Sequence, residues 1–217
     1  MLFYIVAALT AWYMVPAWCA HWVVRGMARM TLLALGYRED SQYAMTTFPD
    51  KFVWVGGPHT HLSDIVYTHL VMYAYNLHSH VLQLPINQKY FVFPLNLALY
   101  AIGGFPVNTS KRGEGIVASV VNHMQTSEKK MMVALAPSGT RSRTEYWRSG
   151  FYHIARLANV PVVATYLCSK TNLYGSSVLK SLSGNLEQDM EWFREFYKGK
   201  EGVVPANTSP VRLRNES

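Results

Sequence analysis

The first 24 residues contain no Asp, Glu, Lys or Arg, although the 217-residue chain carries a net charge of +7. An uncharged apolar run of this length is long enough to cross a bilayer as a helix, which requires about 20 residues. No basic residue precedes the run, which argues against a cleaved signal peptide. Four aromatic side chains of the kind found at membrane interfaces lie within it: Trp12, Tyr13, Trp18 and Trp22. We therefore expect a hydrophobic membrane-anchoring helix at the N-terminus.

The residues after this run extend the anchor and orient it. Met27–Leu35 has the pattern of a second, short amphipathic helix ended by Gly36, so that residues 1–37 form the predicted anchor. Because the nearest basic residues follow the run, the positive-inside rule places the remaining domain on the cytoplasmic side of a membrane. Pro16 disfavours a straight helix, so a re-entrant segment is an alternative to a spanning one, and burial in a soluble core is a third interpretation.

Cysteine and charge are both scarce in this chain. Cys19 and Cys168 are its only cysteines, too few for a disulfide framework, and no zinc-finger spacing occurs. Only 15% of the residues are charged, and no RNA-binding aromatic signature is present, so we expect no nucleic-acid partner. The positive net charge, combined with abundant Tyr and Trp, is better suited to the surface of an anionic lipid bilayer.

Residues 38–217 have the pattern of a single α/β domain. Strand-like apolar runs recur at Phe52–Val55, His80–Leu84, Ile102–Val107, Met131–Ala136 and Val162–Leu167. Helical patterns occur at Ser63–Tyr75, Gly113–Met124, Trp147–Ala158 and Leu186–Tyr197, and the tail from Lys198 has an irregular pattern. This alternation predicts a largely parallel central sheet flanked by helices.

His59 and Asp64 lie where the first of these strands passes into a helix. This is the carboxyl edge of a sheet, where α/β proteins place their chemistry. A carboxylate that binds one ring nitrogen fixes the tautomer of the imidazole and leaves the other nitrogen free to accept a proton. The pair therefore predicts a general base that acts on a hydroxyl group. Two alternatives are a helix cap and a metal-dependent hydrolase that uses His59, His61 and Asp64, although the spacing fits known metal sites poorly.

Two further loops with polar residues follow predicted strands. Residues 103–112 contain glycines, hydroxyls and two cations, and residues 137–143 contain Gly139, Thr140 and Arg141. Glycine lets a backbone approach a ligand closely, and arginine binds phosphate in a bidentate manner. Three such loops at one edge of a sheet predict a substrate site.

The chain resembles the membrane-associated glycerolipid acyltransferases, the lysophosphatidate acyltransferase family. Four motifs occur in the family's order: His59-x4-Asp64, Gly104–Asn108, Ser138–Ser142 and Val160–Val163. The resemblance covers about residues 50–200. It implies that His59 deprotonates an acceptor hydroxyl, which attacks the thioester of acyl-CoA or acyl carrier protein, while Asp64 orients His59. No cofactor and no metal are implied; the partners are the bilayer, a lysophospholipid acceptor and the acyl donor.

The resemblance also assigns residues to substrate binding and exposes two departures. The assigned residues are Gly104, Phe105, Val107, Asn108, Thr109, Lys111, Arg112, Ser138, Gly139, Thr140, Arg141 and Pro161. Thr109 stands where the family has an arginine that is thought to bind the acceptor's phosphate, and Ser138 stands where it has a glutamate. These departures leave the acceptor head group open. They also leave a catalytically idle lipid-binding module as an alternative to the membrane-bound O-acyltransferase.

Overall fold

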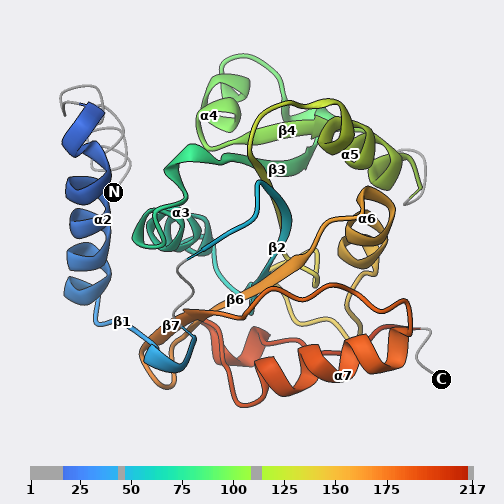
Figure 1. Cartoon of the computed structure of the whole chain (residues 1–217). Coiled ribbons are helices and arrows are strands. Elements are labelled where there is room, and N and C mark those ends of the chain that lie inside the picture. Colours follow the sequence, from blue (N-terminus) through green and yellow to red (C-terminus); the bar gives the residue numbers. More distant parts are fainter. Residues whose placement is uncertain (1–16, 44–46, 109–113, 215–217) are drawn as a thin grey trace.

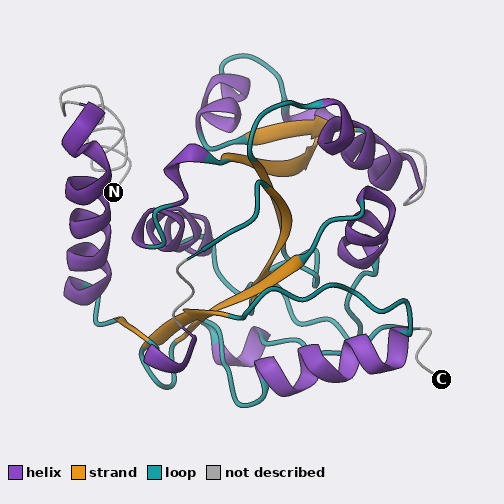
Figure 2. Ribbon diagram, viewed as in Figure 1, coloured by secondary structure: helices purple, strands orange, loops and turns teal. Residues whose placement is uncertain are grey.

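A computed structural model describes residues 17–43, 47–108 and 114–214, which fold around one seven-stranded sheet (Figures 1 and 2). The strands are β1 (Arg38–Glu39), β2 (Lys51–Gly57), β3 (Val81–Asn87), β4 (Gly104–Val107), β5 (Met131–Leu135), β6 (Val162–Cys168) and β7 (Leu173–Ser176). Their order across the sheet is β1-β7-β6-β2-β5-β3-β4. Every neighbouring pair is parallel except β6 and β7, which are antiparallel. The prediction of a largely parallel sheet is therefore confirmed.

The helices connect the strands and lie on both faces of the sheet (Figure 2). They are α2 (Ala17–Ala34), α3 (Asp64–Ala74), α4 (Leu95–Ala101), α5 (Glu114–Thr126), α6 (Gly150–Ala158) and α7 (Leu186–Tyr197). Short 3₁₀ turns occur at η2 (Ser41–Tyr43), η3 (Leu77–Ser79), η4 (Gln88–Tyr90) and η5 (Pro205–Asn207). The five predicted strands and the four predicted helices of the domain are all present. The two short strands β1 and β7 and the seven-residue helix α4 were not predicted.

Two hydrophobic clusters cover the two faces of the sheet. Side chains alternate between the faces along a strand, so that Val53 and Val55 of β2 join one cluster and Phe52 and Trp54 join the other. The first cluster contains side chains of α5, α6 and α7, and the second contains side chains of α2 and α3. Because both faces are covered, the central strands are apolar along most of their length.

Within the described residues, the N-terminal segment contributes the helix α2. α2 runs without a break from Ala17 to Ala34, and Gly36, which follows its end, has a φ of +90°. Its residues Ala28 and Leu32 are buried in the second cluster, so this part of the predicted anchor packs on the domain beside α3. Among the described residues, no helix has the length and apolar character needed to cross a bilayer. Residues 1–16 of the predicted anchor lie outside the described residues.

The sheet divides at its carboxyl edge. β3 pairs with β5 only over Val81–Gln83, and from Leu84 to Asn87 it pairs with β4 alone. The amide of Val81 faces the β5 side, where it donates to the carbonyl of Lys130, and that of Leu84 faces β4. Successive amides along a strand point to opposite sides, so the amide of residue 85 would be the next one to face β5. Residue 85 is a proline, which has no N–H to donate. β3 and β5 therefore separate beyond Gln83.

The start of β4 depends on a glycine that an alanine could not replace. Gly103 has a φ of +84°, and a Cβ atom there would lie 2.6 Å from the backbone oxygen of Leu82. We expect Gly103→Ala to lower the free energy of unfolding by about 1–3 kcal/mol. Gly26→Ala is the control, because a Cβ atom at Gly26 meets nothing within 4 Å and alanine favours a helix by about 0.5–1 kcal/mol. Thermal unfolding of the two variants in the same detergent measures the difference. Equal stability of the two variants would show that position 103 tolerates a side chain.

Candidate functional site

His59 and Asp64 form a hydrogen-bonded pair at the carboxyl end of β2. The Nδ1 atom of His59 lies 2.9 Å from Oδ2 of Asp64, the first residue of α3. The same oxygen accepts hydrogen bonds from the backbone amides of Thr60 (2.7 Å) and His61 (2.9 Å). A carboxylate has no hydrogen to donate, so it accepts from Nδ1–H, and the Nε2 atom of His59 is left as the basic nitrogen. The side chain of His59 is 30% exposed, which leaves the ring accessible.

The loop that carries His59 is held by parts of the chain distant in sequence. The Oγ1 atom of the buried Thr60 accepts a hydrogen bond from the amide of Val204, and its carbonyl accepts one from the side chain of Asn207. The hydroxyl group of Tyr197 in α7 donates a hydrogen bond to the carbonyl of Val55, two residues before the end of β2. Burial raises the pKa of Tyr197, so this hydroxyl remains a donor. The C-terminal tail, expected to be irregular, therefore supports the predicted catalytic loop.

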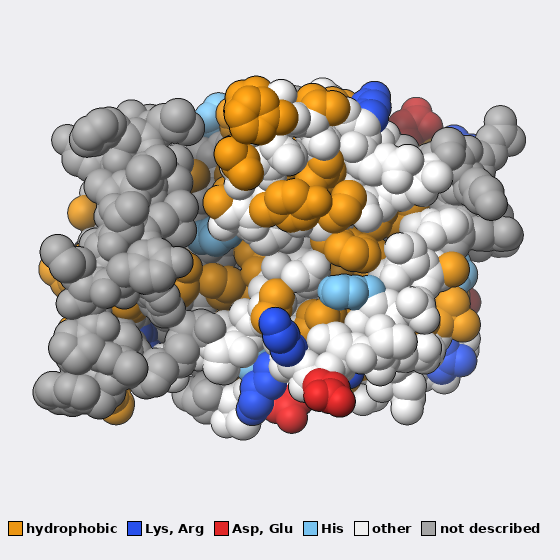
Figure 3. Space-filling model, turned by 90° about the horizontal axis from the view of Figure 1, so that it is seen from above, with side chains coloured by type: hydrophobic (Ala, Val, Ile, Leu, Met, Phe, Trp, Pro, Cys, Tyr) orange, Lys and Arg blue, Asp and Glu red, His pale blue; other side chains and the backbone are white. Residues whose placement is uncertain are grey.

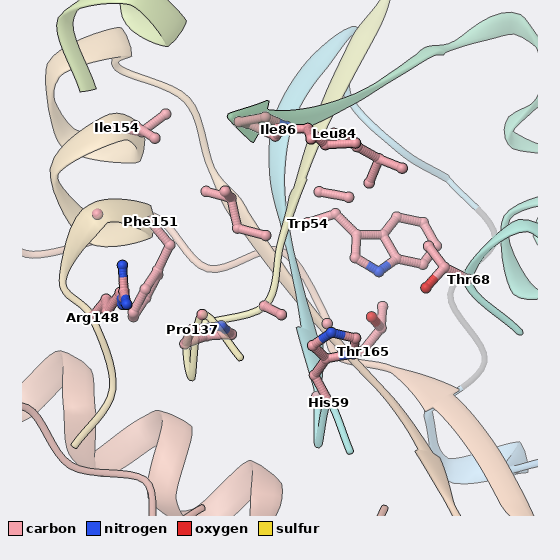
Figure 4. A pocket seen from close by; sticks show the side chains of 18 of the residues that line it. Trp54, His59, Thr68, Leu84, Ile86, Pro137, Arg148, Phe151, Ile154 and Thr165 are labelled. Atoms are coloured by element: carbon pink, nitrogen blue, oxygen red, sulfur yellow. The ribbon is translucent and has the colours of Figure 1, made fainter. Parts of the chain in front are cut away.

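A cavity of about 1280 Å³ extends from this pair into the divided part of the sheet. Its lining includes Leu84 and Ile86 of β3, Trp54 of β2 and Phe151 of α6, and is mainly apolar. Figure 4 shows His59 at one end of the cavity, with Leu84 and Ile86 at the opposite end. Typical small-molecule sites have volumes of about 300–1,000 Å³. The cavity is therefore large enough for a substrate with a long apolar part.

The cavity contains some of the predicted site residues and excludes others. His59, Asp64, Val107 and Gly139 line it. Gly104, Phe105, Asn108, Ser138, Thr140, Arg141 and Pro161 do not, and Thr109, Lys111 and Arg112 lie outside the described residues. Phe105 instead stacks on His123 of α5, with ring centroids 4.6 Å apart. The cavity thus brings four of the predicted residues together, and the role of the others in substrate binding stays a prediction.

Pro161 is far from the cavity for a topological reason. It precedes β6, and its carbonyl accepts the amide hydrogen bond of Val53 near the start of β2. The starts of parallel strands lie at the amino edge of a sheet, whereas His59 follows the end of β2. The fourth motif of the sequence therefore contributes a core strand rather than a wall of the cavity.

The loop between β5 and α6 contains an arginine that the sequence analysis missed. Arg148 lines the cavity, and its side chain passes over Gly139, where a Cβ atom would lie 2.6 Å from its Nε atom. Figure 4 places Arg148 on the same side of the cavity as Phe151. It is the only Lys or Arg among the described residues of the lining. Gly139 had been expected to admit a ligand, whereas the structure shows it admitting this guanidinium group.

Arg141 and Ser138, in the same loop, have different surroundings. Arg141 is exposed, as Arg148 is, but unlike Arg148 it does not line the cavity. Ser138 is buried, and its hydroxyl donates a hydrogen bond of 2.8 Å to the carbonyl of Thr140, which closes the loop on itself. Gly139 and Arg148 are the first and last residues of a ten-residue segment, and the fold of the loop brings them together. Their contact therefore could not be read from the sequence.

The geometry around His61 bears on the metal-site alternative. Its Nδ1 atom lies 2.8 Å from the hydroxyl of Ser63 and accepts the amide hydrogen bond of the same residue. Within residues 17–43, 47–108 and 114–214, no three His, Cys, Asp or Glu side chains are grouped so as to hold a metal ion. His61 thus belongs to the turn that precedes α3, where it supports the backbone.

A parallel α/β sheet with a His–Asp pair at its carboxyl edge, beside a large apolar cavity, is typical of an enzyme that activates a hydroxyl group. The family model described as Acyltransferase matches residues 48–167, which is more than half of the chain. The chain therefore belongs to this family of glycerolipid acyltransferases and is an enzyme that transfers acyl groups. The comparisons with curated proteins and with solved structures gave no match.

The His–Asp pair predicts a clear difference between two neighbouring histidines. We expect His59→Ala to lower the rate of thiol release from acyl-CoA, in the presence of lysolipid acceptors, by about 10²–10⁴-fold, because general-base assistance is lost. His61→Ala should retain most of the wild-type rate, since His61 only supports the turn. Equal rates for wild type and His59→Ala would contradict the role of the base. An equal loss in both variants would favour a metal site.

Proposed function

We propose that this protein is a membrane-bound O-acyltransferase that moves a fatty acyl group from acyl-CoA or acyl carrier protein to the hydroxyl group of a lysophospholipid. One observation carries the proposal: the 2.9 Å contact between His59 and Asp64 stands at one end of a cavity of about 1280 Å³ with mainly apolar walls. The pair supplies a base for the hydroxyl group, and the cavity supplies room for a lipid chain. Membership of the acyltransferase family supports the reaction class.

The proposed reaction needs one proton acceptor and no covalent enzyme intermediate. The Nε2 atom of His59 removes the proton of the acceptor hydroxyl as its oxygen attacks the thioester carbonyl. The tetrahedral intermediate then expels the thiolate as the C–S bond breaks, and the imidazolium returns its proton to the sulfur. Asp64 stabilises the imidazolium by accepting its Nδ1 hydrogen bond. The products are an ester and a thiol, and His59 is restored to its neutral form.

The apolar end of the cavity is suited to an acyl chain. Leu84 and Ile86 lie on the part of β3 that has left β5, and Ile154 of α6 faces the cavity from another side (Figure 4). Burying an apolar chain is favourable by about 0.8 kcal/mol for each CH₂ group. In our proposal, a chain that enters this end brings its reacting carbonyl toward His59, at the other end of the cavity.

Arg148 is our candidate for binding the negatively charged head group of the acceptor. It lines the cavity, and no acidic side chain within the described ranges pairs with it. A guanidinium group binds phosphate through two parallel hydrogen bonds. Arg148 would thus supply the charge that Thr109 cannot, whereas the sequence motif favours Arg141. A lysophosphatidate-like acceptor is consistent with this arrangement.

The membrane association and the cytoplasmic orientation are also part of the proposal. They are supported by the uncharged first 24 residues and by the exposed apolar side chains of α2, which include Trp22, Met27 and Met30. An enzyme whose substrates are lipids needs its site at the bilayer surface. Residues 1–37 would provide that attachment.

The sequence motif assigns the head group of the acceptor to Arg141, whereas the cavity lining assigns it to Arg148. Variants of these two arginines distinguish the two assignments. Arg148→Gln should lower kcat/KM for a lysophospholipid with a phosphomonoester head group by about 10–100-fold, because charged hydrogen bonds of about 1.5–3 kcal/mol are lost. The same change should have little effect on a neutral monoacylglycerol acceptor. Arg141→Gln is the matched control. Product analysis by mass spectrometry with both acceptors measures the effect, and a larger loss in Arg141→Gln would refute the assignment to Arg148.

The divided sheet predicts a limit on acyl length. Ile86→Trp places a larger side chain at the end of the cavity opposite His59, so long-chain donors should lose about 10-fold in kcat/KM while short-chain donors are spared. Val178→Trp serves as the control, since Val178 is 72% exposed and does not line the cavity. A series of acyl-CoA lengths provides the measurement. An unchanged length preference in Ile86→Trp would place the acyl chain elsewhere.

A further inference from the structure

The segment between β3 and β4 exposes an unusual number of large apolar side chains. Six of them form what we call the 90–100 surface: Tyr90, Val92, Phe93, Leu95, Leu97 and Tyr100. Phe93 is the most exposed of the six, at 80%. None of the six lines the cavity, so the substrate site does not account for their apolar character. Large apolar groups that gather on a protein surface mark contact with a partner or with lipid.

The charge pattern around this surface identifies the kind of partner. No Asp or Glu occurs from Ile65 to Gly113. Within the segment itself, the exposed Lys89 lies over the ring of Tyr90, 4.9 Å from its centroid. Exposed aromatic and aliphatic side chains, accompanied by a cation and by no acid, match the interface of a bilayer that contains anionic lipids.

The 90–100 surface is continuous with the substrate cavity along the chain. Ile86 and Asn87, the last residues of β3, line the cavity, and η4 and α4 follow directly. Figure 3, which looks down on the end of the molecule that carries α4, shows apolar side chains gathered over this end. A bilayer in contact with this segment would therefore lie next to the walls of the cavity.

We propose that the 90–100 surface inserts into the interfacial layer of an anionic bilayer, as a membrane contact separate from residues 1–37. The segment lies flat at the level of the head groups, with Phe93 and Leu97 among the acyl chains and Lys89 near lipid phosphates. This contact holds the end of β3 at the lipid surface. The inference rests on the proposed function, because the role of this membrane contact is to bring a lipid substrate to the cavity.

A fluorescent probe on the full-length chain tests the contact directly. Phe93→Cys and, as the matched control, Val178→Cys are each made in a Cys19→Ala background; Cys168 is buried and will not be labelled. Each is labelled with a nitrobenzoxadiazole dye and reconstituted into vesicles of phosphatidylcholine and phosphatidylglycerol. We expect a doxyl group on the lipid chains to quench most of the fluorescence at position 93 and little of it at position 178. Both residues are highly exposed and apolar, so only their location differs.

Two outcomes would overturn the inference. Equal quenching at both positions would show that the contact is not specific to this surface. A blue-shifted but unquenched probe at position 93 would show that the surface is covered by protein, such as a second copy of this chain. The measurement needs no turnover, so it stands or fails independently of the acyl transfer reaction.

A paired variant links the contact to substrate use. Phe93→Ser with Leu97→Ser should lose several-fold in activity on a lysophospholipid presented in vesicles. It should keep wild-type activity on a short-chain lysophospholipid below its critical micelle concentration, because neither residue lines the cavity. An equal loss on both acceptors would contradict a role at the lipid surface. Full activity on both would do so as well.

Discussion

The site of this protein depends on the point at which β3 stops pairing with β5. A continuous sheet would place backbone hydrogen bonds where the cavity now lies, and the cavity exists because the two strands part beyond Gln83. Pro85 has no amide hydrogen to continue the pairing on the β5 side. Leu84 and Ile86 thereby become walls of a cavity instead of members of a packed core. One missing donor thus has consequences for the volume, shape and apolar character of the whole site.

The carboxylate of Asp64 organises the opposite end of the cavity. Its Oδ2 atom accepts hydrogen bonds from two backbone amides as well as from His59, so that one side chain fixes both the turn and the imidazole. The turn is held in addition by Thr60, which binds the C-terminal tail. A base that must take a proton at a defined position requires such rigid support. The tail is therefore part of the site even though it contributes no group to the chemistry.

A charged group, the His59–Asp64 pair and an apolar chamber are combined within one cavity, and in our proposal each of them receives one part of a lysophospholipid. Arg148 is suited to its head group, His59 to its hydroxyl group and the divided sheet to a fatty acyl chain. Gly139 links these functions, because its positive φ of 66° and its missing side chain leave the space through which Arg148 passes. The 90–100 surface, which follows β3, would place this cavity next to the bilayer. In our proposal, a lipid substrate would then never leave an apolar environment completely.

The sequence by itself determined the α/β class, the five strands β2 to β6, the four main helices of the domain and the pairing of His59 with Asp64. These features depend on local periodicity and on short spacings, which a single chain displays directly. The tertiary structure alone decided that Arg148 rather than Arg141 lines the cavity, that Pro161 stands at the far edge, and that the tail supports Thr60. It also showed that residues 17–34 form a single helix, α2, which packs beside α3. Each of these facts depends on contacts between residues far apart in the chain, or on which way a loop turns, and neither leaves a periodic pattern.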